Sequence, residues 1–232
     1  EIGVPYSDPG MDGPVIQEAV EVAVRAGVGM RDVLRAVEAV AAAGAAAVVM
    51  SYWNPIERYG VERFATDLAA AGGAGAITPD LIPDEAGAWL AASERADLDR
   101  VFLVAPSSTD ARLRATTAAS RGFVYVASTM GVTGTRSTVG DAARTLVART
   151  REARPDLAPC VGLGGSNGDQ AAETGSARRE RHAPTVTARA AHPRDQRGGS
   201  AQTWYWTAAR ARRIGRTNSA TTERCTGSWA YR

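Results

Sequence analysis

Two carboxylates separated by a loop rich in glycine and proline are the residues whose types and spacing could carry out chemistry. Glu1 lies on a short strand end, and Asp12 lies late in the loop that follows it. Two carboxylates that approach one substrate from different sides suit paired acid–base catalysis. Asp beside Pro or Gly also commonly bonds its own backbone, so a turn is the alternative interpretation of Asp8 and Asp12.

Residues for other common kinds of catalysis are scarce. The chain has two cysteines, Cys160 and Cys225, and two histidines, His182 and His192. This set predicts neither a metal-ligand cluster nor a disulfide framework nor a Ser-His-Asp triad. No dinucleotide-binding glycine motif and no P-loop follows a predicted strand. The sequence therefore predicts no metal and no nucleotide cofactor.

The composition is that of one compact domain. Of the 232 residues, 44% are hydrophobic, 22% are charged and 6% are aromatic. These fractions exclude disordered, collagenous and coiled-coil classes, and no apolar run approaches membrane-spanning length. By composition alone we therefore expect a soluble protein rather than a membrane protein.

Charge divides the chain after Glu173. Up to that residue there are 15 arginines against 22 acidic residues, and from Thr174 onward there are 12 arginines against 3. The chain has no lysine, which fits a coding bias toward GC-rich codons. We expect residues 1–173 to form the folded domain. Residues 174–232 are interpreted as an arginine-rich tail, either disordered or produced by a frameshift, and nucleic-acid binding by its interleaved arginines and aromatics is the alternative.

Short apolar, β-branched runs alternate with helical patterns over residues 1–173, as in βα units. Pro14 suits a first helical turn, and Asp84 and Asp110 suit helix starts. The expected strands are residues 1–4, 46–52, 75–77, 100–105, 122–127 and 159–163. The expected helices are residues 14–26, 30–43, 61–71, 84–96, 109–120 and 141–154.

Such a rhythm predicts an α/β protein with a parallel sheet, which is either an open doubly wound sheet or a closed barrel. Polar residues, proline or glycine follow nearly every expected strand. The active site of a barrel is built from residues at the ends of all of its strands. An open sheet concentrates the site at one crevice instead. The pattern therefore favours a TIM (βα)8 barrel of which about six of the eight units are present.

Seven motifs, in order along residues 1–173, resemble the tryptophan synthase alpha chain family. They occupy residues 1–14, 50–60, 78–85, 102–110, 122–128, 131–135 and 161–166. The resemblance implies an eight-stranded βα barrel in the cytoplasm. It also implies retro-aldol cleavage of indole-3-glycerol phosphate to indole and glyceraldehyde 3-phosphate, a carbon–carbon lyase step of tryptophan biosynthesis. This chain would carry no cofactor, because pyridoxal phosphate belongs to the beta partner of an alpha2beta2 tetramer.

The resemblance also implies roles for individual residues. Glu1 would protonate the indole ring at C3 and remove the proton from the glycerol hydroxyl. Asp12 would accept the indole N–H. The substrate-binding residues would be Met50, Tyr52, Tyr125, Leu163, Gly164 and Thr133, with Gly164 on the phosphate and Thr133 on a closing loop. The residues toward the beta partner would be Asp8, Asn54, Asp80 and Pro83.

The chain departs from the family pattern at both ends. The family has a strand–helix unit before the position of Glu1, and after Glu173 it continues with an eighth strand and a phosphate-binding Gly-Ser turn. We therefore expect an N-terminally truncated alpha chain with two open sheet edges, poor solubility and no lyase activity. Two other hypotheses stay open, a free-standing indole-3-glycerol phosphate lyase and an inactive remnant that only binds the beta partner.

Overall fold

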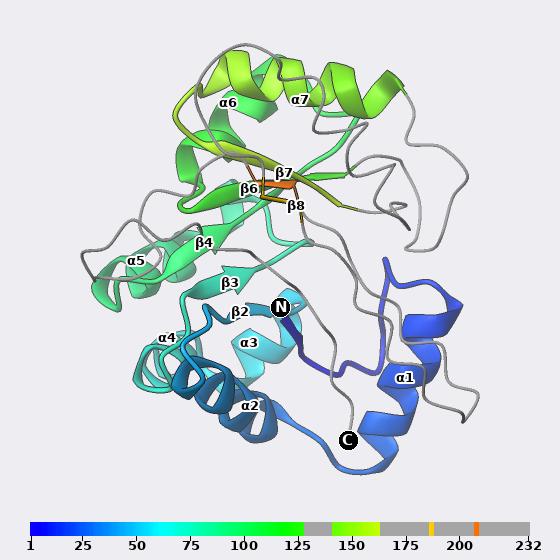
Figure 1. The fold of residues 1–232 in the computed structure, drawn as a ribbon, viewed down its shortest axis with the longest axis vertical. Helices are drawn as coiled ribbons and strands as arrows, with labels where there is room; N and C mark the ends of the chain where they lie inside the picture. The colour runs from blue at the N-terminus through cyan, green and yellow to red at the C-terminus, as the bar shows by residue number, and fades with distance from the viewer. Residues whose placement is uncertain (128–140, 163–185, 188–206, 209–232) are drawn as a thin grey trace.

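Parallel strands with helices on their outer side make up most of the described part of the chain (Figure 1). The computed structural model describes residues 1–127, 141–162, 186–187 and 207–208. The strands are β1 (Ile2–Gly3), β2 (Val48–Met50), β3 (Gly75–Ile77), β4 (Asp99–Val101), β5 (Leu103–Val104), β6 (Phe123–Ala127), β7 (Ala158–Gly162), and the antiparallel pair β8 (Val186–Thr187) and β9 (Thr207–Ala208). The helices are α1 (Pro14–Arg25), α2 (Met30–Ala42), α3 (Trp53–Tyr59), α4 (Val61–Ala70), α5 (Gly87–Arg95), α6 (Asp110–Ala119) and α7 (Asp141–Ala153), with the 3-10 turn η1 (Pro83–Glu85).

The order of the strands in space follows their order in the chain. β1, β2, β3 and β4 pair in parallel, and so do β5, β6 and β7. Two backbone hydrogen bonds join the two sets, from Arg121 N to Arg100 O at 2.8 Å and from Tyr125 N to Phe102 O at 2.9 Å. β4 and β5 therefore form one strand position. Six consecutive positions that turn in one direction are the arrangement of a βα barrel, which confirms the predicted fold class and rules against a doubly wound sheet.

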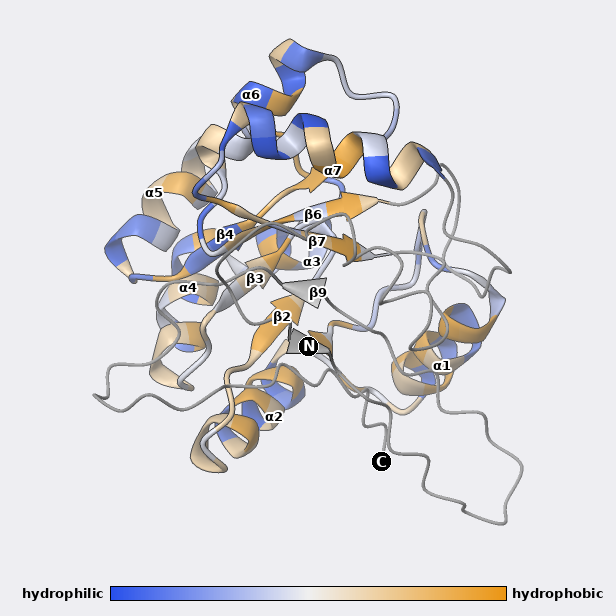
Figure 2. Cartoon of the chain, turned by 45° about the horizontal axis from the view of Figure 1, so that its top comes forward, coloured by the Kyte–Doolittle hydropathy of each residue, from blue (hydrophilic) through white to orange (hydrophobic). Residues whose placement is uncertain are grey.

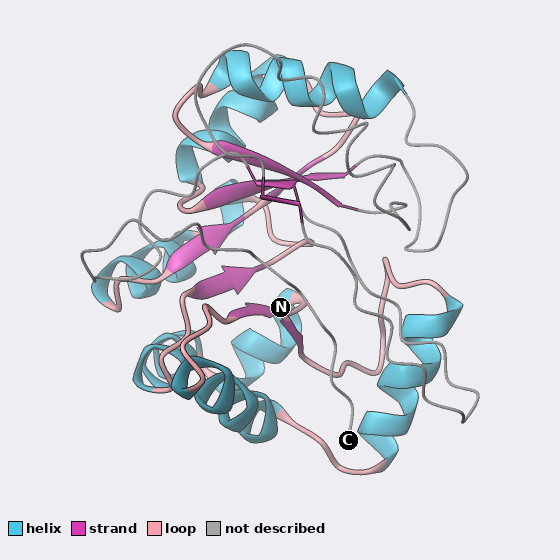
Figure 3. Ribbon diagram, in the orientation of Figure 1, coloured by secondary structure: helices cyan, strands magenta, loops and turns pink. Residues whose placement is uncertain are grey.

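Helices α2, α4, α5, α6 and α7 lie along one side of this sheet, whereas α1 lies apart from them (Figure 1). Figures 1 and 3 show α2, α4 and α5 beside the first four strands and α6 and α7 over β6 and β7. Figure 2 shows apolar colour along the strands and mixed colour on the helices, as expected for helices with one buried face.

Most predicted elements lie within a few residues of the observed ones. Pro14 stands in the first turn of α1, and Asp110 in the first turn of α6, as predicted. The single helix predicted over residues 84–96 is wrong, because η1 and α5 are separated there by Ala86. A periodicity of three to four residues does not distinguish a 3-10 turn that leads into an α-helix from a continuous helix.

One helix and one interruption were missed. The strand predicted over residues 100–105 is broken at Phe102, where the chain passes from β4 to β5. Helix α3 was not predicted, because its first backbone N–H, that of Trp53, donates to the carboxylate of Asp80 at 2.9 and 3.1 Å. A cap supplied by a residue so far along the chain leaves no local pattern.

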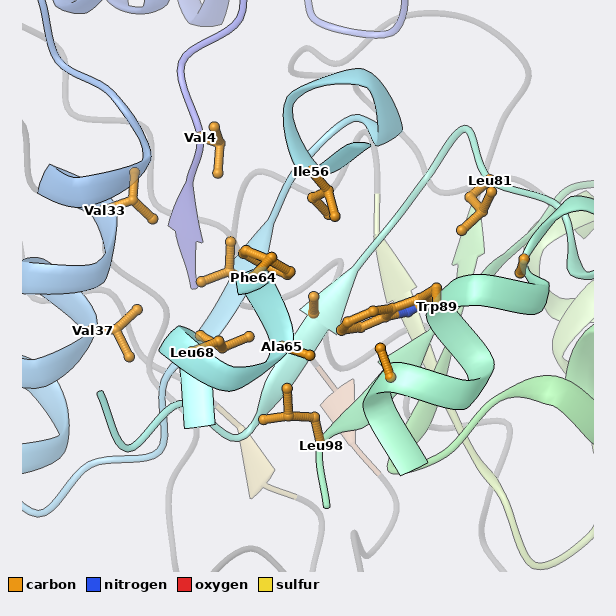
Figure 4. Packing of buried hydrophobic residues seen from close by; sticks show 14 of the residues in the cluster. Val4, Val33, Val37, Ile56, Phe64, Ala65, Leu68, Leu81, Trp89 and Leu98 are labelled. Carbon is orange, nitrogen blue, oxygen red and sulfur yellow. The ribbon is translucent and has the colours of Figure 1, made fainter. Parts of the chain in front are cut away.

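Side chains alternate between two layers of core. The outer layer under α2, α4 and α5 contains Phe64 and Trp89, whose rings lie 5.8 Å apart (Figure 4). A second outer cluster lies under α6 and α7. The inward layer comprises Ile77, Val101, Tyr125 and Ala127, with Met50 packed against it. Because successive strand residues point to opposite faces, this inward layer lines the side of the sheet away from the helices.

At the amino ends of the strands, Asp99 is packed between two glycines. A Cβ on Gly75 would overlap the backbone carbonyl of Asp99, and a Cβ on Gly122 would lie within 3 Å of its side chain. The Asp99 carboxylate accepts from Arg121 Nε at 3.1 Å. These contacts bring β3, β4 and β6 together with no room for a methyl group.

The substitution Gly75→Ala therefore tests the close approach of β3 and β4. We expect it to lower the free energy of unfolding by about 2–3 kcal/mol, because the backbone of Asp99 must move. Gly87→Ala is the matched control, since a Cβ there meets nothing within 4 Å. That control should change stability by less than about 1 kcal/mol, because it stands on a helix with open space. Equal urea midpoints for the two variants would contradict the packing described.

Candidate active site

Glu1 directly precedes β1 and faces the inward layer. Ile2 packs against the outer cluster, so alternation places Glu1 and Gly3 on the opposite, inward face. The register of β1 on β2 agrees with this placement, because Ile2 pairs with Val49, which also belongs to the outer cluster. The residue as a whole is half-buried, but its carboxylate oxygen Oε2 is fully buried and has no hydrogen-bond partner among the described residues.

Burial changes the acidity of this carboxyl group. Desolvation raises the pKa of Glu1 from 4.5 to about 7, and the positive charge of the chain's first amino group lowers it in part. A carboxyl group with a pKa near neutrality exchanges its proton readily at physiological pH. Glu1 therefore has the acidity required of a residue that both donates and accepts a proton.

Asp12 lies in the loop between β1 and α1, where it is held by Tyr52. The hydroxyl of Tyr52 accepts from Met11 N at 2.8 Å and is hydrogen-bonded to the Asp12 side chain. Burial raises the pKa of Asp12, and the hydrogen bond from Tyr52 offsets part of that rise. The two carboxylates therefore occupy different environments, as paired acid–base work requires.

Met50 and Tyr125 belong to the same inward cluster, as a shared pocket wall would require. Tyr125 is 4% exposed and lies on β6, and its hydroxyl and ring lie over Gly162 at the end of β7. A Cβ on Gly162 would overlap that ring, so a residue larger than glycine would displace Tyr125. Gly162 was not singled out from the sequence, although it opens a glycine-rich run after a strand.

The predicted substrate residues Thr133, Leu163 and Gly164 lie outside the described residues. Of the four residues predicted to face a partner, Asp8 and Asp80 lie in loops, Asn54 lies in the first turn of α3 and Pro83 begins η1. Asp8, Asn54 and Asp80 are exposed, and Pro83 is half-buried at the start of η1. Asp80 also accepts from the backbone of Trp53, so it fixes the start of α3 in addition to any contact with a partner.

Comparison with known proteins identifies the family. Residues 1–178 match the family model described as tryptophan synthase alpha chain. The chain belongs to the tryptophan synthase alpha chain family. The alpha chain of Thermobifida fusca is 67% identical over 178 residues, which are 76% of this chain and 66% of that protein. The alpha chain of Mycobacterium avium is 66% identical over 175 residues, which are 75% of this chain and 64% of that protein.

Solved structures of the family have the same fold. A Mycobacterium tuberculosis tryptophan synthase structure matches with a TM-score of 0.72 at 63% identity, covering 76% of this chain and 67% of that one. A structure of the Pyrococcus furiosus a2b2 complex matches with a TM-score of 0.70 at 29% identity, covering 75% and 71%. These relatives are TIM barrels, and the chain spans about two thirds of the length of the curated relatives that it matches.

Two further features concern the described part of the chain only. Within residues 1–127 and 141–162, no three side chains of the types His, Cys, Asp or Glu gather in a way that could hold a metal ion. Likewise, none of the helices described in those ranges has the length and apolarity needed to cross a membrane.

The buried Glu1 carboxyl group predicts a pH-dependent stability. Its pKa is about 7 in the folded chain against 4.5 ordinarily, so the native state binds more protons than the unfolded state between these values. Stability due to this group is therefore fully present below pH 4.5 and is lost as the pH rises through about 7. We expect Glu1→Leu to be increasingly more stable than the parent chain across that window, by about 2–4 kcal/mol in total.

Urea unfolding of both chains from pH 4.5 to pH 8 measures this difference. Glu18→Gln, at an exposed position on α1, is the control for the loss of an acidic side chain outside the site. A stability gap between Glu1→Leu and the parent chain that is the same at every pH would show that the carboxyl group is not buried.

Proposed function

We propose that this chain carries the chemistry of the tryptophan synthase alpha subunit, cleavage of indole-3-glycerol phosphate to indole and glyceraldehyde 3-phosphate. The observation that supports this most is the Glu1 carboxyl group, which is buried against the apolar inward layer and has a pKa of about 7. The reaction requires one group that gives a proton to carbon and takes one from oxygen. Such a group works best when its pKa lies near the operating pH.

The two carboxylates divide the proposed work. Protonated Glu1 gives its proton to C3 of the indole ring, which converts the ring into an indolenine, a better leaving group. The resulting carboxylate removes the proton from the glycerol hydroxyl as the carbon–carbon bond breaks, and the electron pair of that bond restores the aromatic ring. Asp12 accepts the indole N–H and stabilises the positive charge that develops on the nitrogen.

The inward cluster supplies the apolar surface for the ring. Met50 and Tyr125 lie together there, and an apolar wall of this kind excludes water and holds a planar ligand by contact. We assign Leu163 to the same wall, Gly164 to the phosphate and Thr133 to a closing loop. These three assignments rest on the family motifs alone.

We propose a beta chain as the partner, in an alpha2beta2 assembly. The exposed residues Asp8, Asn54 and Asp80, with Pro83, would form the contact surface. Two observations support this, the exposure of three of these side chains and the a2b2 complex named for the Pyrococcus furiosus relative. Pyridoxal phosphate would belong to the beta chain, this chain would hold no cofactor, and the reaction would take place in the cytoplasm.

Indole release tests the proposal. The two open sheet edges predict an inactive chain. The buried Glu1 carboxyl group predicts instead that the full chain, mixed with indole-3-glycerol phosphate with and without a beta chain from a relative, releases indole. Glu1→Leu and Asp12→Asn should each lower the rate about 100-fold or more, the usual effect of removing an acid–base residue. Glu18→Gln, exposed on α1, should keep the parent rate.

Three other outcomes would contradict parts of the proposal. Indole release that a beta chain does not change would identify a free-standing lyase. Absence of release together with stimulation of the beta chain would identify an inactive remnant that only binds its partner. Release that survives Glu1→Leu unchanged would show that the buried carboxyl group is not the acid–base residue.

A further inference from the structure

The backbone at Tyr52 is held on both sides. Ser51 N, just before it, donates to Ile77 O on β3 at 3.1 Å, and the Ser51 hydroxyl donates to the carbonyl of Tyr52 at 2.7 Å. Just after it, Trp53 N donates to the carboxylate of Asp80 at 2.9 and 3.1 Å. Tyr52 therefore stands on a fixed point between β2 and α3.

The side chain of Tyr52 extends from this point to the loop between β1 and α1. Its ring packs on the ring of Tyr6 with centroids 5.4 Å apart. Its hydroxyl makes two contacts with consecutive residues of the loop, accepting from Met11 N at 2.8 Å and hydrogen-bonding the Asp12 carboxylate. One phenol thus holds the backbone of the loop at Met11 and lies beside the Asp12 carboxylate.

The Tyr52 hydroxyl is protonated at neutral pH. Burial, together with the nearby carboxylates of Asp12 and Asp80, raises the pKa of Tyr52 to about 12. At neutral pH the group is therefore a neutral O–H that donates to Asp12 and accepts from Met11 N at the same time.

We propose that Tyr52 is a positioning residue, which acts on the reaction by holding Asp12 and its loop in place. The family resemblance implies that Tyr52 binds substrate, whereas the contacts of its hydroxyl are with the protein itself. The proposal deepens the proposed function, because it concerns the carboxylate assigned to the indole nitrogen. The hydrogen bonds themselves exist whether or not the chain cleaves indole-3-glycerol phosphate.

The test is Tyr52→Phe, which removes the hydroxyl and keeps the ring on Tyr6. Tyr6→Phe is the matched control, because it removes the other hydroxyl of the same ring pair. The carboxyl carbon of Asp12, assigned by comparison with Asp12→Asn, is followed by NMR through a pH titration of the full chain. In Tyr52→Phe the titration of Asp12 should move to higher pH, because a hydrogen bond that favours the carboxylate is lost.

Amide exchange gives a second readout that does not depend on activity. Met11 N–H should exchange about tenfold faster in Tyr52→Phe, the factor expected for one lost hydrogen bond, while the amides of β3 keep their rates. Tyr6→Phe should leave both the Asp12 titration and the Met11 exchange unchanged. An unchanged Asp12 titration in Tyr52→Phe, or equal effects of the two variants, would overturn the proposal.

Kinetics separate this proposal from the proposed function. If the parent chain releases indole, Tyr52→Phe should lower kcat about tenfold and change KM less than about twofold, because substrate is still bound while Asp12 is misplaced. A rise in KM with kcat unchanged would make Tyr52 a substrate-binding residue and overturn the positioning role. A parent chain that releases no indole, yet shows the predicted NMR changes, would refute the proposed function and leave the positioning role standing.

Discussion

The strict alternation of side chains along parallel strands is the constraint on which the site depends. Alternation sends Val49 to the helix-covered layer and Met50 to the inward layer, and the pairing of Ile2 with Val49 turns Glu1 inward as well. A carboxyl group placed there loses hydration and gains no partner for Oε2 among the described residues. The near-neutral pKa of Glu1 is therefore a consequence of the register of β1 on β2. A shift of that register by one residue would turn the Glu1 side chain to the helix-covered side of the sheet.

The second carboxylate is placed by a different means. Asp12 belongs to a loop, whose backbone is not held by a sheet, and its position depends on a phenol that extends from the end of β2. The position of Tyr52 in turn depends on two hydrogen bonds, from the backbone N–H of Ser51 to β3 and from the first N–H of α3 to the Asp80 carboxylate. A chain of short contacts thus transmits the rigidity of the sheet to a loop residue. It also begins at Asp80, one of the residues proposed to face a beta chain.

The sequence predicts the parts of this architecture that depend on local patterns. Apolar periodicity locates six strand positions, and the order of βα units identifies the barrel class, because both depend on residues close together in the chain. Helix α3 escaped prediction since its cap comes from Asp80, and the role of Tyr52 escaped because Met11 lies 41 residues away. Gly162 was missed for a similar reason, as only the fold shows that the ring of Tyr125 lies over it. Contacts between residues that lie far apart in the chain can be found only from the structure.

The pKa of the Glu1 carboxyl group tests the central claim most directly. Carbon-13 NMR of the full chain, with the Glu1 resonance assigned by its absence in Glu1→Leu, gives that value from a pH titration. Burial against the inward layer predicts a midpoint of about 7. A midpoint near the ordinary value of 4.5 would show a hydrated carboxylate, and it would contradict both the placement of Glu1 and its proposed part in catalysis.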